Sequence, residues 1–229
     1  MPLSTLLFHG TLLARLTTAP YPFAVGERLE YQARIGMVPV GTAMMAVNPM
    51  SQVRGRETFV FAASGEVRPL GLRMAAELTS WVGAKGFNSL RFHRRIIQGS
   101  SVDDAQFQIV PDSSRYRQLG VPQDWAAPPD PLDELAFLYY LRTAPLRVGQ
   151  TYSIPRYFKT GYNPVQVRVV GRDTRTLPGG RTAPALMLEI TSRGMVVAVT
   201  LTDDARRLPV ELVLPLPFGQ VTLALTRAA

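Results

Sequence analysis

The chain lacks cysteine and has few residues suited to acid–base or metal chemistry. Without cysteine it has no disulfide, no cysteine-ligated zinc or iron–sulfur centre, no thiol nucleophile and no acylated lipoprotein cysteine. Its two histidines are His9 and His93. Because His9 lies in the N-terminal lead segment, a serine–histidine–aspartate site would need His93, and no Gly-x-Ser-x-Gly elbow accompanies it. We therefore expect no metal, no cofactor and no catalytic residue, and we predict that the protein is not an enzyme.

Lysine is also scarce, although the chain is basic, with a net charge of +8. Only Lys85 and Lys159 are lysines among its 25 basic residues. The positive charge is spread over the whole chain, and the one local cluster, Arg91–Arg95, lies in an alternating segment that sends basic groups to both faces. Nucleic-acid binding needs a basic stripe on one face. The sequence therefore predicts no nucleic-acid partner.

Hydrophobic residues make up 46% of the chain and charged residues 18%, which is enough apolar material for a folded core. Nineteen prolines and eighteen glycines recur along its length and favour short strands joined by turns. Alternation with a period of two residues is the dominant pattern. It predicts strands in residues 26–35, 42–47, 58–64, 75–82, 87–97, 102–110, 152–154, 165–169, 183–191, 195–202, 210–214 and 220–226.

One helix is expected, at about 131–142, after a polar, proline-rich segment at 112–131 that we interpret as an exposed loop. Asp130 or Asp133 would cap the helix, and Pro145 would end it. The fold class that follows is mainly β, an antiparallel curved half-barrel or two-sheet sandwich of about ten to fourteen strands with this one main helix.

The N-terminus differs from the rest of the chain. Residues 1–21 contain an apolar stretch that includes Leu6, Leu7 and Phe8, but they have no early positive charge, and Arg15 interrupts them. The segment is too short and too interrupted to span a membrane. We interpret 1–21 as a leader or signal-like segment, with a short irregular lead-in as the alternative, and 22–229 as a single β-rich domain.

Three groups of residues carry a family resemblance. They are Pro22–Tyr31 with Val38–Ala43, then Asp130–Leu132 with Tyr139–Arg142 and Leu146–Gly149, and finally Arg206–Val210 with Pro217–Gly219. Each group is mostly turn chemistry, and their joint order and spacing carry the likeness. Over roughly residues 22–226 the chain is similar to the bacterial family known as domain of unknown function 3108.

The resemblance implies a β-rich protein of the Gram-negative envelope, usually exported and without an assigned enzyme activity. From it we expect a periplasmic or cell-envelope location. The family has no established catalytic residues that could be transferred to this chain. Its members usually carry a clear signal peptide, and the leader at 1–21 departs from that pattern.

The residues that we predict to bind a ligand are Trp81, Tyr139, Tyr140 and Arg142. In many carriers of hydrophobic ligands, a helix beside a curved sheet covers one mouth of an apolar cavity. Arg142 would then meet an anionic head group. The alternative interpretation is structural, with Tyr139 packed in the core and Arg142 paired with an acidic neighbour.

Three functions remain open on this basis. The first is a non-enzymatic envelope protein that binds a lipid or another hydrophobic or amphipathic ligand in an apolar concavity. The second is a structural or adaptor domain that binds a protein or glycan, such as an envelope protein partner, at a sheet edge. The third is a hydrolase without a recognisable motif.

Overall fold

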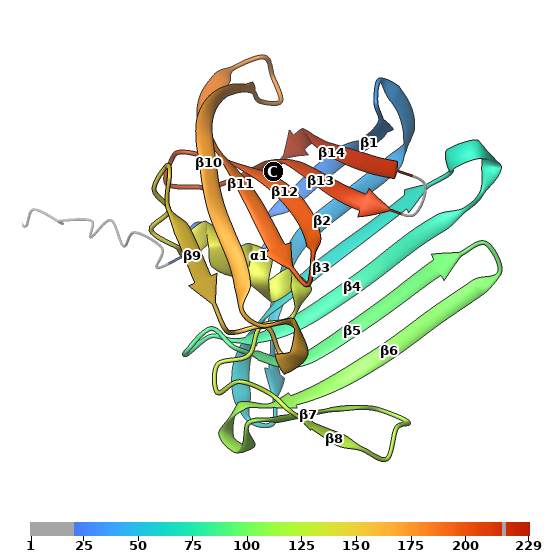
Figure 1. The fold of residues 1–229 in the computed structure, drawn as a ribbon, viewed down its shortest axis with the longest axis vertical. Helices are drawn as coiled ribbons and strands as arrows, with labels where there is room; N and C mark the ends of the chain where they lie inside the picture. The colour runs from blue at the N-terminus through green and yellow to red at the C-terminus, as the bar shows by residue number, and fades with distance from the viewer. Residues whose placement is uncertain (1–20, 217–218) are drawn as a thin grey trace, which may run out of the picture.

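The computed structural model describes residues 21–216 and 219–229 and shows one curved antiparallel β-sheet with an α-helix packed against it (Figure 1). This confirms the predicted mainly β fold with one main helix. The sheet is continuous and is not closed into a barrel. The leader predicted at 1–21 falls almost wholly outside the described residues.

Fourteen strands form the sheet in the described part of the chain. The first eight are β1 (Arg28–Ile35), β2 (Val38–Val53), β3 (Arg56–Val67), β4 (Met74–Gly83), β5 (Ser89–Gln98), β6 (Ser101–Val110), β7 (Arg115–Gln118) and β8 (Asp124–Ala126). After the helix α1 (Glu134–Thr143) come β9 (Thr151–Ile154), β10 (Val165–Thr176), β11 (Thr182–Ser192), β12 (Met195–Thr202), β13 (Pro209–Leu216) and β14 (Gly219–Ala228). Three short 3₁₀ turns lie at Pro69–Gly71, Pro111–Ser113 and Thr160–Tyr162.

The middle of the sheet is formed by the two ends of the described chain, because β1 pairs with β2 on one side and with β14 on the other. We call β1–β8 the first half and β9–β14 the second half. Figure 1 shows the second half turned away from the plane of β4–β6, with α1 lying against the sheet. A backbone bridge between Leu132, just before α1, and Tyr157, just after β9, joins the two halves again.

Alternation along the strands decides which side chains face the helix. In β1, Leu29, Tyr31 and Ala33 are buried, whereas Arg28 and Arg34 are exposed. We call the face that carries the buried set the inner face, and the opposite one the outer face. Burying one large apolar side chain contributes about 1.5–3 kcal/mol, so this pattern fixes the side of the sheet on which the helix packs.

The helix begins after Asp133, one of the two capping residues that the sequence predicts. Asp133 is the N-cap, and its Oδ1 accepts hydrogen bonds from the backbone N–H groups of Leu135 and Ala136 at 3.1 and 2.9 Å. The helix ends at Thr143, two residues before Pro145, in agreement with the predicted stop. Its first turn starts later than predicted, because the cap falls on Asp133 rather than Asp130.

The interpretation of residues 112–131 as an exposed loop is wrong in part, since β7 and β8 lie within it. Tyr116 of β7 and Trp125 of β8 are directly opposite each other, and their rings stack at 5.3 Å. Tyr116 also packs edge-on against Phe107 and Phe158. Cross-strand aromatic contacts of this kind stabilise a short hairpin that the polar composition does not indicate.

Candidate functional site

Tyr139 and Arg142, two of the predicted ligand-binding residues, belong to α1, and their side chains point into the core between the helix and the sheet. The ring of Tyr139 is fully buried and stacks on Phe61 of β3, with centroids 3.8 Å apart. Burial raises the pKa of the Tyr139 hydroxyl well above its ordinary value, and Glu27 adds to the rise against the opposing charge of Arg142. The tyrosine therefore acts as a neutral packing group in this position.

Arg142 forms the central ion pair of the same core. Its Nη1 and Nη2 donate to the two carboxylate oxygens of Glu27 at 2.6 and 2.8 Å. Nη2 also donates to the carbonyls of Pro22 and Arg206. Although Arg142 borders a hollow of about 400 Å³, its charge is already neutralised by Glu27. This is the structural arrangement that we gave as the alternative. The guanidinium is fully buried, so it presents no exposed edge to a head group, although its Nε has no hydrogen-bond partner among the described residues.

Trp81 and Tyr140 lie elsewhere. Trp81 is on the outer face of β4, and the guanidinium of Arg91 lies 4.6 Å from its ring. Tyr140 is half-buried beside Phe87, under the guanidinium of Arg156 at 4.7 Å. The structure thus brings Tyr139 and Arg142 together and places Trp81 on the opposite face, so the four residues do not surround one binding surface.

Asp133, the helix cap, is the most deeply buried carboxyl near this core. Its Oδ2 accepts hydrogen bonds from the hydroxyls of Ser80 on β4 and Ser89 on β5 at 2.6 and 2.7 Å. Burial raises the pKa of Asp133 to about 7, and the hydrogen bonds from Ala136 N–H, Ser80 and Ser89 oppose that rise. This carboxyl fixes the start of α1 to two strands.

The strands continue past the part of the inner face that α1 covers. We call this further part the open end. In the first half, Ala63 on β3 and Leu78 on β4 lie in register and Ile96 lies further along β5, and the second-half members lie on β11, β12 and β14. All are half-buried and apolar: Ala63, Leu78 and Ile96 in the first half, and Ile190, Val197 and Leu223 in the second. All of them except Ile96 pack against the main core.

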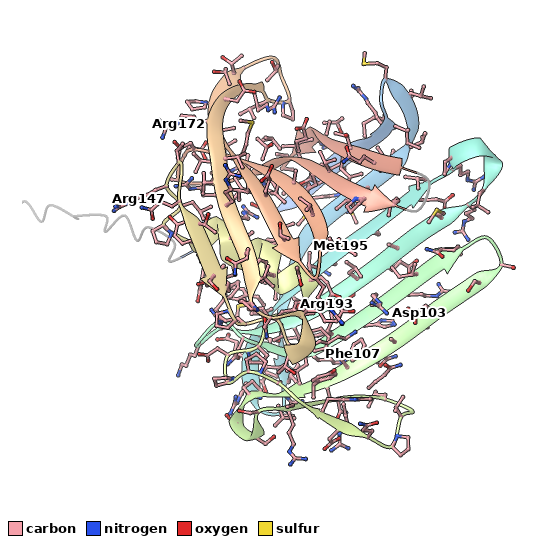
Figure 2. All side chains as sticks on the ribbon, viewed as in Figure 1. Asp103, Phe107, Arg147, Arg172, Arg193 and Met195 are labelled. Carbon is pink, nitrogen blue, oxygen red and sulfur yellow. The ribbon has the colours of Figure 1, made fainter. Side chains whose placement is uncertain are left out.

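Two cations stand beside this apolar surface. Arg94 of β5 lies in register between Leu78 and Ala105, and its Nη2 donates to Asp103 at 2.7 Å. Its Nε is buried and has no partner among the described residues. In Figure 2, the labels of Asp103 and Phe107 mark β6 on this side, and Met195 marks the start of β12 in the other half.

Lys159 is the second cation, on the loop that follows β9. Its Nζ lies 4.7 Å from the ring centroid of Phe107 and 5.3 Å from that of Phe158. Burial lowers its pKa; Arg94 adds to that effect, while Glu134 and Asp103 oppose it. In the described part of the chain, no acidic side chain lies within 4 Å of the ammonium group. A half-buried cation with no carboxylate in direct contact is suited to receive an anion.

The outer face carries a different kind of surface. A hollow of about 530 Å³ lies over β1–β4, and its lining carboxylate Glu66 pairs with Arg73 in the lining at 3.0 Å and with Arg68 outside it at 2.8 Å. These pairs hold the pKa of Glu66 below its ordinary value. The hollow is lined mainly by polar side chains, so it differs from the apolar concavity that the sequence led us to expect.

His93 also lies on the outer face. Its Nε2 is 2.8 Å from Asp104 Oδ1, and both side chains are partly exposed. None of the described hydrogen bonds joins His93 to a hydroxyl, so the nucleophile of a catalytic triad is missing from this pair. The described residues also contain no group of three or more side chains placed to hold a metal ion.

Arg94 and Lys159 were missed as site residues. Arg94 was noted only within the basic cluster Arg91–Arg95, and the alternation there does not say which members face inward. Lys159 had one usable signal, because it is one of two lysines in a chain that otherwise uses arginine.

Comparisons with known proteins agree with this fold. The family model described as "Protein of unknown function (DUF3108)" matches residues 30–226. A solved structure, "Crystal Structure of Beta-barrel-like Protein of Domain of Unknown Function DUF1849 from Brucella abortus", is similar, with 10% identity and a TM-score of 0.53 over 89% of this chain and 96% of that one. At this identity the similarity concerns the fold alone. No curated protein matches the chain. Within the described residues, no helix has the length and apolar character needed to cross a membrane.

Proposed function

The chain belongs to the DUF3108 family, and we propose that it binds, without chemically changing it, an anionic amphiphile on the open end of its inner face. The ligand class is a molecule with an acyl tail and a carboxylate or phosphate head group. The tail would cover the half-buried apolar side chains of the open end, and the head group would contact Lys159 and Arg94.

The observation that carries this proposal is the ammonium of Lys159. It is half-buried on two phenylalanine rings, and no acidic side chain of the described residues lies within 4 Å of it, although the charges of Glu134 and Asp103 act on it from further away. Such a group is costly to desolvate without a counter-ion, so an anion that arrives from solution gains a strong electrostatic contact. The adjacent Arg94 supplies further donors for a head group that has several oxygens.

The apolar part of the ligand is supported by the surface next to these cations. Leu78 lies between Ala63 and Arg94 in register across the strands, and Ile96 follows Arg94 by two residues on the same face of β5. Covering half-exposed apolar groups gains about 25 cal/mol per Å². A cation next to such a surface therefore favours an amphiphile over a fully polar anion.

The periplasmic or cell-envelope location stays a prediction, and fractionation of the host with an antibody to the chain tests it. Lipid ligands of the proposed class are abundant in a bacterial envelope, so the two proposals are compatible. Recovery in the cytoplasmic fraction would contradict the location without affecting the binding proposal.

The binding experiment has two steps. Native mass spectrometry of protein purified from its own host, followed by lipid extraction, should show a bound anionic amphiphile. Titration with hexadecanoate and with a lysophospholipid then compares the carboxylate and phosphate head groups. Because a hydrogen bond to a charged group is worth about 1.5–3 kcal/mol, we expect K159Q and R94Q each to weaken binding by about tenfold or more.

The matched control is R168Q, which removes one exposed arginine from the outer face of β10. We expect it to change the dissociation constant by less than about twofold, because exposed charges are screened. Equal losses in all three variants would indicate bulk charge rather than a site. No binding to the wild-type protein and no copurified lipid would refute the proposal.

A second candidate function is supported by the edge of β6. β7 pairs only with residues 107–110 of that strand, and in the described chain residues 101–105 pair on one side only, with β5. An unpaired edge can accept an extended protein segment as an additional strand. A proline at Val102 would block such pairing, and capture of one defined partner by the wild type but not by V102P would support the adaptor function.

A further inference from the structure

Asp103 lies on the inner face of β6, opposite Ile96 and diagonal to Arg94. Its Oδ2 accepts a hydrogen bond from Arg94 Nη2 at 2.7 Å, and no second contact of this pair is present. The side chain of Asp103 is 57% exposed, whereas that of Arg94 is 28% exposed. The carboxylate therefore holds Arg94 by one contact, from the solvent side.

We infer that Asp103 is an internal competitor of the ligand, whose carboxylate occupies on Arg94 the place that the head group takes when it binds. This inference rests on the proposed function and concerns the regulation of that same site. In the unliganded protein Arg94 is neutralised by Asp103, and a bound head group replaces that ion pair with its own contacts.

The exchange is physically reasonable because the two anions are unequal. Asp103 makes one hydrogen bond to the guanidinium, while a carboxylate or phosphate can engage arginine through two parallel bonds. A ligand anion also contacts Lys159, which has no acidic side chain of the described residues within 4 Å. The released Asp103 returns to water at little cost, since more than half of its side chain is exposed already.

Asp104 provides an unusually close control. It is the next residue of the same strand, it carries the same charge, and it points to the outer face, where it contacts His93 and Arg95. D103N and D104N therefore change the net charge equally, by one, at neighbouring positions on opposite faces. Any general electrostatic attraction of the ligand is the same in both variants.

The experiment is titration of wild type, D103N, D104N and R94Q with hexadecanoate, followed by fluorescence or calorimetry. Because a mostly exposed ion pair in the upper part of its usual range is worth about 0.7–1 kcal/mol, D103N should tighten binding by about threefold to fivefold. D104N should stay within about 1.5-fold of the wild type, which is the expectation for a screened charge.

Other outcomes overturn the inference in distinguishable ways. If the wild type binds and R94Q does not, but D103N matches D104N, the site exists and Asp103 does not compete for it. Weaker binding by D103N would show that Asp103 positions Arg94 instead. If neither the wild type nor D103N binds hexadecanoate or a lysophospholipid, the proposed function fails and this inference fails with it.

Discussion

The covered end and the open end of the inner face hold their charges in opposite ways. Under α1, Arg142 meets both oxygens of Glu27, and Asp133 accepts four hydrogen bonds. At the open end, Arg94 has one exposed counter-ion, and Lys159 has no acidic side chain of the described residues within 4 Å. At the covered end, Arg142 is thus neutralised by a two-oxygen contact, although its Nε is buried without a hydrogen-bond partner among the described residues, and Asp133 is held by neutral donors. A partly buried cation that lacks a partner is typical of a binding site.

The largest expected effect on stability comes from replacing an arginine at the covered end, and the same replacement at the open end is its comparison. R142M leaves Glu27 buried without a counter-charge, which costs about 3–5 kcal/mol. R94M breaks a mostly exposed pair, so we expect a loss below about 1 kcal/mol. Urea unfolding followed by tryptophan fluorescence measures both free energies. A loss in R142M no greater than that in R94M would remove the distinction between the two ends.

The next effect is a pH dependence at the covered end. Burial raises the pKa of Asp133 to about 7 from its ordinary 3.8, so the folded protein keeps a proton that the unfolded chain releases between these values. The stability that this proton contributes is complete below about pH 4 and is lost as the pH rises through about 7. A pKa difference of this size corresponds to at most about 4 kcal/mol.

D133N provides the comparison, because asparagine remains a good helix cap but does not titrate in this range. The unfolding free energy of the wild type minus that of D133N should fall as the pH rises from 4 to 8. Glu66 on the outer face serves as the control, because Arg73 and Arg68 lower its pKa. Its contribution to the unfolding free energy therefore depends on pH in the opposite direction and is lost as the pH falls. A flat difference for D133N would mean that the hydrogen bonds of Asp133 offset its burial.

The covered end was largely predictable because its signals are local. The cap at Asp133, the helix through Tyr139 and the stop at Pro145 all lie within a dozen or so residues, and alternation predicted the strand that contains β1. The partner of Arg142 was not predictable, since Glu27 lies 115 residues away and nothing in their spacing relates them. Alternation likewise separates Trp81 from Ser80 but does not say which of them faces inward.

The open end was not predictable, because it depends on how the two halves meet. Lys159 reaches Phe107 only because the loop after β9 folds back over β6, and that loop is held by the bridge between Leu132 and Tyr157. Each of these contacts joins a segment that precedes α1 in the sequence to one that follows it. Period-two patterns describe single strands and contain no information on such long-range pairing.

The smallest expected effect is also the one that separates stability from binding. Burial lowers the pKa of Lys159, so its charge is held at a cost in the folded protein, and methionine packs well on the two phenylalanine rings. After allowance for solvent screening, we expect K159M to leave the unfolding free energy unchanged or to raise it by about 0.3–0.5 kcal/mol. The gain should shrink as the pH rises from the lowered pKa toward 10.5, where the lysine loses its charge in both states.

Binding of hexadecanoate by the same variant should weaken by about tenfold. A residue whose removal stabilises the fold and weakens binding is retained for the ligand. A loss of more than about 1 kcal/mol would instead make Lys159 a structural anchor of the loop and give both ends of the inner face the same role.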